Sequence, residues 1–166
     1  MINLEMDFTF DNLLITDVKI WNCSMRRFRN IEVLFDTGAR ISAIDAVSFR
    51  NLGYDFSDAR DMFVTTASNN RLSTKRAMIH DLMLGDFEIG PFVVDVIDFP
   101  IAHFQMILGL DIIKEFKNVL NFEEQTFQMS PRYSTGKISF ENFDYNSSRY
   151  GDGQLSNIIN LLNREK

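Results

Sequence analysis

The chain has 166 residues, which is long enough for one domain with a substantial hydrophobic core. Hydrophobic residues make up 45% of it and charged residues 24%, proportions typical of soluble globular proteins. Its net charge of −6 argues against non-specific binding to nucleic acid, and its single cysteine, Cys23, excludes an intramolecular disulfide.

Targeting signals are also missing from the sequence pattern. Residues 1–5 contain neither a basic segment nor the start of a long apolar one, so no secretory signal peptide is predicted. No apolar run approaches the ~20 residues that a membrane-spanning helix needs. Together with the lone cysteine, which fits a reducing compartment, these features lead us to expect a cytoplasmic protein without a membrane partner.

The first thirty residues predict two strands and a loop. Residues 1–10 alternate apolar and acidic side chains, which is typical of a half-exposed strand. Asp11 and Asn12 indicate a turn, and residues 13–21 resume the strand character. Residues 22–30 are polar and basic, and we expect them to form an exposed loop.

Residues 31–44 predict a strand, a sharp polar turn and a second strand. The apolar run 33–35 is continuous rather than alternating, which indicates a strand buried on both faces. An unpaired charge at the end of such a strand is costly, so the Asp36 carboxylate must be hydrogen-bonded, paired or protonated. Thr37 offers a hydroxyl, and Gly38 allows the backbone to approach closely. Asp36 is therefore a candidate for acid–base chemistry.

A short helix and a hairpin are predicted next. Asp45 can cap a helix over residues 46–52. Two strands, over residues 62–67 and 73–84, flank residues 68–71, whose composition indicates a turn.

The following segment predicts further strands and one short helix. A strand over residues 87–97 contains a kink at residues 90–91, a Gly-Pro pair. A buried strand over residues 104–108 precedes a short helix over residues 110–117. Residues 119–129 predict a last hairpin.

The composition changes after Pro131. Residues 132–153 are rich in Ser, Asn, Tyr and Gly and predict an extended arm, whereas residues 154–165 carry the apolar stripe of an amphipathic helix. We therefore expect a main domain over residues 1–130 and a C-terminal arm with a short helix over residues 131–166.

Four segments, in a fixed order, point to one family. They are the triplet Asp-Thr-Gly with Ala39 after an apolar strand, the short helix region 45–54, the hairpin region 84–96, and the segment 107–113, which matches the pattern I-L-G-x-D-x-[IL]. Together they resemble the aspartic proteases of the retropepsin-like, single-domain type. The resemblance covers roughly residues 15–129.

The resemblance implies an all-β fold, the retropepsin-like acid-protease β-barrel with short helices, which closes as a two-fold homodimer. Its chemistry needs two carboxylates that share a proton, because two like charges a few ångströms apart cannot both ionise. The sequence contains one Asp-Thr-Gly and no second such triplet, so the implied catalytic dyad combines Asp36 from two copies. Thr37 would lock the two loops together, and Gly38 would direct its amide toward the carboxylate.

The implied reaction is hydrolysis of a peptide or protein substrate by an activated water, with no covalent intermediate, no cofactor and no metal. The resemblance places substrate contacts at Ala39 and at the tip of a hairpin, the flap, that closes over the peptide. In this chain the tip residues are Ala67, Ser68, Asn69, Asn70 and Arg71. The tip lacks the glycines that usually let a flap bend, although asparagine can adopt the left-handed conformation in their place.

Other polar residues give weaker signals. Asp111 is more typical of a helix cap or an ion-pair residue than of a second catalytic acid. His80 and His103 lack the spacing of metal ligands, and the acidic loop 55–61 lacks the glycine and terminal glutamate of an EF-hand.

Two rival functions stay open at this point. The same fold with weak or lost activity could serve as a peptide-binding adaptor module, which the atypical hairpin tip favours. A structural or oligomerisation protein would instead use Asp36 only as a turn residue. The intact Asp-Thr-Gly triplet favours the protease over both.

Overall fold

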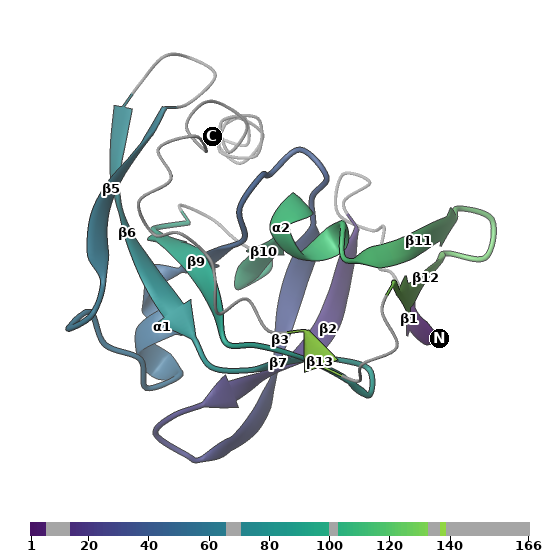
Figure 1. The fold of residues 1–166 in the computed structure, drawn as a ribbon, viewed down its shortest axis with the longest axis horizontal. Helices are drawn as coiled ribbons and strands as arrows, with labels where there is room; N and C mark the ends of the chain where they lie inside the picture. Colours follow the sequence, from purple (N-terminus) through teal and green to yellow (C-terminus); the bar gives the residue numbers. More distant parts are fainter. Residues whose placement is uncertain (6–13, 66–70, 100–102, 133–136, 139–166) are drawn as a thin grey trace.

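A long mixed sheet and a small antiparallel sheet build the fold (Figure 1). The computed structural model describes residues 1–5, 14–65, 71–99, 103–132 and 137–138. The larger sheet has the strand order β13-β8-β7-β2-β3-β10-β4-β9-β6-β5, and the smaller has the order β1-β12-β11. In chain order the elements are β1 (Ile2–Glu5), β2 (Ile15–Asn22), β3 (Arg27–Phe35), β4 (Ala43–Asp45), α1 (Ala46–Asn51), β5 (Arg60–Thr65), β6 (Arg71–Ile79), β7 (Leu82–Leu84), β8 (Phe87–Ile89), β9 (Phe92–Ile97), β10 (Met106–Leu108), α2 (Leu110–Ile113), β11 (Phe116–Asn121), β12 (Thr126–Pro131) and β13 (Lys137–Ile138).

Strand β10 lies between β3 and β4 in the larger sheet. It pairs in parallel with β3, where Leu108 lies opposite Phe35, and antiparallel with β4. The chain that leaves β3 must therefore cross the end of β10 before it can enter β4. We call residues 36–42 the crossing loop. Because β3 and β10 run parallel, Asp36 and Gly109 leave the sheet at the same edge.

Strand β3 is buried on both faces, as its apolar run predicts. Val33, Leu34 and Phe35 are only 0%, 2% and 5% exposed. Val33 and Phe35 belong to the larger hydrophobic cluster, whereas Leu34 packs in a second cluster with Ala43 and Ile107. A slip of one residue would exchange these two faces, so the packing fixes the register of β3 and with it the position of the crossing loop.

The predicted short helix is confirmed as α1. The Asp45 carboxylate caps its N-terminus by accepting a hydrogen bond from the Ser48 amide at 3.0 Å. Past its C-terminus, Gly53 has a φ of +80°, a left-handed backbone conformation that favours glycine.

Three predicted boundaries are wrong. The predicted loop 22–30 is in part strand, because β3 already begins at Arg27 and pairs with β2 as an exposed ribbon that polar side chains can form. The predicted strand 73–84 is divided between β6 and β7. The predicted short helix ends at Ile113, since the buried Phe116 starts the next strand, β11.

The expected all-β architecture with short helices is confirmed, but the expected closed barrel is not seen among the described strands. The order of the larger sheet ends at β13 on one side and at β5 on the other, with no pairing recorded between them. In the described ranges, neither helix has the length and apolar composition that crossing a membrane requires.

Several predictions fall outside the described residues. These are the end of the first strand and the turn after it, the hairpin tip before Arg71, and the C-terminal helix over residues 154–165. Of the expected C-terminal arm, the structure describes strand β13, which pairs in parallel with β8 at the edge of the larger sheet.

A buried ion pair joins β6 to β9. Arg76 and Asp95 are cross-strand partners, and their side chains are only 6% and 4% exposed. The guanidinium donates from Nε to Oδ1 at 2.8 Å and from Nη2 to Oδ2 at 3.2 Å. This two-point contact fixes the hairpin of β5 and β6 to β9, the next strand in the sheet.

Replacing Arg76 alone should destabilise the fold, because it leaves the Asp95 carboxylate buried without its cation. We expect Arg76→Met to lower the free energy of unfolding by about 3–5 kcal/mol. The double variant Arg76→Met/Asp95→Leu should lose much less, since both charges are removed. Urea unfolding of the three proteins measures the difference, and equal losses in the single and double variants would contradict it.

Candidate active site

Asp36 occupies the first position of the crossing loop. Its amide donates to the carbonyl of Leu108 at 3.0 Å, which continues the pairing of β3 with β10 by one step. Its carboxylate is half-buried, and Oδ1 accepts a hydrogen bond from the Gly38 amide at 2.7 Å. Burial raises the pKa of Asp36, while the backbone amides of Gly38 and Ala39 lower it in part.

The neighbouring site residues differ in their exposure. Thr37 is exposed, Gly38 is half-buried and Ala39 is 2% exposed. Ala39 packs in the second hydrophobic cluster, where Phe104 is also buried. The signature residues thus present a carboxylate and a hydroxyl at the surface, backed by apolar side chains.

The segment after β10 holds the crossing loop in place through backbone hydrogen bonds. The Leu110 amide donates to the carbonyl of Ala39 at 2.8 Å, and the Asp111 amide donates to the carbonyl of Arg40 at 3.1 Å. A Cβ atom on Gly109 would lie 2.8 Å from the carbonyl carbon of Ile41 and 2.9 Å from the carbonyl oxygen of Ala39. Only glycine lets the two backbones approach this closely.

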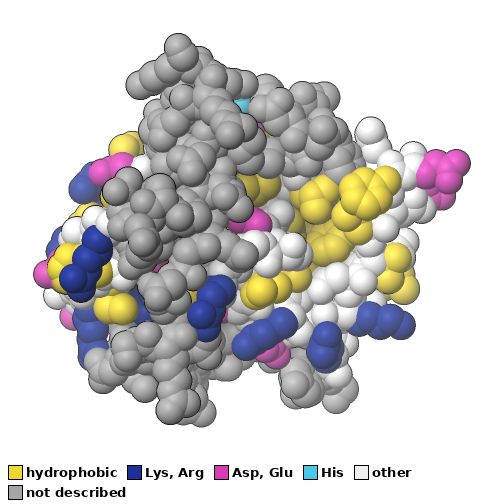
Figure 2. All heavy atoms as spheres, turned by 90° about the horizontal axis from the view of Figure 1, so that it is seen from above, with side chains coloured by type: hydrophobic (Ala, Val, Ile, Leu, Met, Phe, Trp, Pro, Cys, Tyr) yellow, Lys and Arg dark blue, Asp and Glu magenta, His cyan; other side chains and the backbone are white. Residues whose placement is uncertain are grey.

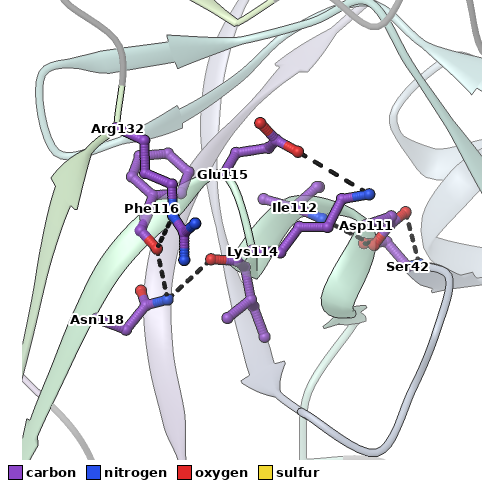
Figure 3. A network of polar contacts seen from close by, with 9 residues as sticks. Ser42, Asp111, Ile112, Lys114, Glu115, Phe116, Asn118 and Arg132 are labelled. Carbon is purple, nitrogen blue, oxygen red and sulfur yellow. Dashed lines mark hydrogen bonds and ion pairs between the residues drawn. The ribbon is translucent and has the colours of Figure 1, made fainter.

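Asp111 holds the far end of the crossing loop (Figure 3). Its carboxylate accepts from the Ser42 amide at 3.0 Å, from the Ser42 hydroxyl at 2.8 Å and from the Ile112 amide at 3.0 Å. Burial raises its pKa to about 6, with a smaller contribution from the negative charge of Asp95, although the hydrogen bonds from Ser42 and Ile112 act in the opposite direction.

The sequence predicted Asp111 as a helix cap or an ion-pair residue, and its main contacts are neither. Gly109 occupies the N-cap position of α2, and two of the three hydrogen bonds of Asp111 reach Ser42, 69 residues away in the chain. Sequence reasoning missed Ser42 altogether. The signal available was a small polar residue inside an otherwise apolar segment, Ile41–Ile44.

The predicted substrate contacts are only partly described. Ala67, Ser68, Asn69 and Asn70 lie outside the described residues. Arg71 begins β6, and its guanidinium carbon lies 4.1 Å from the centre of the Phe63 ring. The predicted hairpin itself is present, with Thr65 opposite Arg71 in the β5–β6 pairing.

Metal ligands do not gather in the part of the chain that the structure describes. No group of three or more His, Cys, Asp or Glu side chains there could hold an ion. The crossing loop itself contributes the Asp36 carboxylate, the hydroxyls of Thr37 and Ser42, the Arg40 guanidinium and backbone amides.

Comparisons with known proteins match the segment that contains the crossing loop to a protein family. The sequence model of a family described as aspartyl protease matches residues 22–112, more than half of the chain. No curated protein matches the chain significantly.

Two solved structures are similar to this one. A retropepsin-like aspartic protease from Rickettsia conorii aligns with a TM-score of 0.58 and 16% identity over 77% of this chain and 88% of that one. The retroviral protease-like domain of Ddi1 from Leishmania major aligns with a TM-score of 0.44 and 15% identity over 74% of this chain and 97% of that one. The first similarity identifies the fold as retropepsin-like.

The raised pKa of Asp111 predicts a specific pH dependence of stability. A carboxyl that binds its proton more tightly in the folded state favours folding below its unfolded pKa of 3.8, and this contribution is lost as the pH rises through about 6. Between pH 4 and pH 6 the free energy of unfolding should fall by about 2 kcal/mol more in the wild type than in Asp111→Asn.

Urea unfolding at several pH values measures this difference. Asp58→Asn makes the same chemical change on an exposed loop residue and should follow the wild-type curve. Parallel curves for the wild type and Asp111→Asn would show that Asp111 does not titrate in this range.

Proposed function

This chain belongs to the aspartyl protease family, and we propose that it is an aspartic endopeptidase that hydrolyses peptide bonds with an activated water. The position of Asp36 supports this most strongly. Its half-buried carboxylate stands at the end of a two-sided buried strand and accepts the Gly38 amide at 2.7 Å. Burial raises the pKa of this carboxyl, which favours the protonated form that one member of a proton-sharing pair must adopt.

The proposed reaction uses Asp36 and the Asp36 of a second copy, which share one proton. The ionised carboxylate takes a proton from water, and the water oxygen forms a bond to the scissile carbonyl carbon. The protonated carboxyl gives its proton to the carbonyl oxygen. The carboxyl that took the proton from water then gives it to the amine nitrogen as the C–N bond of the tetrahedral diol breaks. A diol hydroxyl returns its proton to the other carboxylate, which restores the shared proton and yields a carboxylic acid and an amine.

A second copy is needed because the sequence supplies one Asp-Thr-Gly per chain. We infer that the copies meet through β11, whose outer edge has no pairing strand among the described residues. Val119 on this strand is 49% exposed, and Leu110, next to the crossing loop, is 38% exposed. Figure 2 shows hydrophobic side chains gathered toward this end of the molecule. Exposed apolar residues beside an unpaired edge favour association.

Side-chain hydrogen bonds also connect β11 to the neighbouring helix, α2. The Asn118 side chain donates to the carbonyl of Ile113 at 2.8 Å and to that of Phe116 at 3.1 Å (Figure 3). The first of these bonds connects α2 to β11. The amides of Leu110 and Asp111 in α2 in turn bond to the crossing loop, so β11, α2 and the loop are joined by hydrogen bonds.

We propose an extended peptide as the substrate, held by strand-like hydrogen bonds. Strand β5 ends and β6 begins on the side of the molecule where the crossing loop lies (Figure 1). We keep Ala39, Arg71 and the tip residues 67–70 as proposed substrate contacts. We likewise keep residues 1–130 as the proposed protease domain and residues 131–166 as its C-terminal arm.

Asp36→Asn should abolish cleavage, because the amide cannot take part in the proton transfers. In a digest of a peptide library at mildly acidic pH, we expect the rate to fall by about 10²–10⁴-fold or more. Asp58→Asn, the same change on an exposed loop residue, should cleave like the wild type. An inert wild type that still binds extended peptides would favour the binding module, and equal cleavage by Asp36→Asn would refute the proposed role.

Val119→Lys should separate the copies, because it places like charges on both sides of the proposed interface. Light scattering should then find a monomer at concentrations where the wild type is a dimer, and cleavage should be lost although Asp36 is intact. Val47→Lys is the matched control, since Val47 is 58% exposed on α1, away from β11 (Figure 1). A Val119→Lys protein that remains an active dimer would exclude this interface.

A further inference from the structure

The crossing loop has little support of its own. Within it, the Ala39 amide donates to the carbonyl of Asp36 at 3.2 Å, and the Gly38 amide donates to the Asp36 carboxylate. The other recorded backbone–backbone bonds of the loop reach outward, to Leu108, Leu110 and Asp111 around the end of β10 and to Asp95 of β9. The position of Asp36 therefore depends on groups outside the signature triplet.

Ser42 is where these outside supports meet. Its side chain is fully buried. The hydroxyl accepts the Gly109 amide at 3.0 Å and donates to the Asp111 carboxylate at 2.8 Å, while the Ser42 amide donates to the other Asp111 oxygen at 3.0 Å. Its carbonyl accepts the Asp95 amide from β9 at 3.0 Å. Each polar group of Ser42 is used, and the contacts join the crossing loop, the β10–α2 segment and β9.

The same contacts reach the hairpin of β5 and β6. Asp95, which donates to Ser42, holds Arg76 of β6 through its carboxylate. The negative charge of Asp95 is balanced there by the guanidinium, whereas no ion pair is recorded for Asp111 within the described ranges. Asp111 therefore depends on its hydrogen bonds with Ser42 and Ile112 to remain in an apolar setting.

We propose that Ser42 and Asp111 are positioning residues that hold the crossing loop so that the Gly38 and Ala39 amides face the Asp36 carboxylate. Neither residue would touch the substrate. The effect of these two residues on the rate of cleavage rests on the proposed function, whereas their effect on the pKa of Asp36 does not.

Loss of the Ser42 hydroxyl leaves the Gly109 amide without its acceptor and removes one of the two donors to Asp111 Oδ1, which keeps the Ile112 amide. A buried polar group left unsatisfied costs about 1–3 kcal/mol, which the loop can avoid by moving and admitting water. The Gly38 and Ala39 amides, which stabilise the ionised form of Asp36, would then face its carboxylate for a smaller fraction of the time. The pKa of Asp36 should rise, because hydrogen bonds to the charged form are what lower it.

The test is a carbon-13 NMR titration of the full-length chain with labelled aspartate carboxyls, with the Asp36 signal assigned by its loss in Asp36→Asn. Ser42→Ala should move the Asp36 midpoint upward by about half a pH unit or more. Ser42→Thr, which keeps the hydroxyl, should leave it near the wild-type value. An unchanged midpoint in Ser42→Ala would overturn the proposal.

Asp111→Asn provides a second test if Ser42→Thr does not fold, because it keeps the shape of the side chain but only one acceptor oxygen. Loss of the Asp111 carboxyl, ionised or protonated, would by itself lower the Asp36 midpoint or leave it unchanged. A rise in Asp111→Asn therefore identifies misaligned amides, and no rise contradicts the proposal.

Ile79→Ala controls for a general loss of stability, since Ile79 is fully buried in the main core on β6. It should lower the unfolding temperature without moving the Asp36 midpoint. If the midpoint moves as far in Ile79→Ala as in Ser42→Ala, Ser42 and Asp111 have no specific positioning role.

In the cleavage assay, Ser42→Ala should lower kcat about tenfold or more with KM little changed, because the geometry of the site rather than substrate binding is lost. A wild type that does not cleave would refute the proposed function, while the titration would still decide the positioning role.

Discussion

The pairing of β10 between β3 and β4 constrains the rest of this structure. It forces the chain to pass over the end of β10, and the passing residues are those that carry Asp36. The register of β3 is fixed by burial on both faces, and its last step is the bond from the Asp36 amide to Leu108. A carboxylate at this point is positioned by the packing of a whole strand, even though it belongs to a loop.

Three carboxylates near this crossing are stabilised in different ways. Asp95 is neutralised by a two-point contact with Arg76, and Asp111 is satisfied by three hydrogen bonds from Ser42 and Ile112. Asp36 is the least enclosed, with the Gly38 amide as its recorded partner and part of its surface open to solvent. A proton can therefore reach Asp36 more readily than the two buried acids, which fits a division between one reactive carboxylate and two structural ones.

Symmetry gives a reason for the apolar surface beside this site. One crossing loop holds one carboxylate, and the proposed chemistry requires two within a few ångströms. An unpaired strand edge is normally an aggregation hazard in a monomer, and among the described strands β11 combines such an edge with the exposed Val119. In the proposed dimer, a two-fold contact at this edge would cover it, and the second copy would supply the second carboxylate.

The sequence by itself determined the features that depend on residues adjacent in the chain. The apolar run 33–35 specified a two-sided strand and Asp45 specified the start of α1, because both signals are local. The triplet beginning at Asp36 is also a local signal, and it predicted the candidate site. Only the tertiary structure decided that Arg27 already lies in β3 and that Asp111 supports Ser42. Cross-strand pairing and buried hydrogen bonds join residues far apart in the chain, so the partner that gives each residue its role does not show in the local pattern.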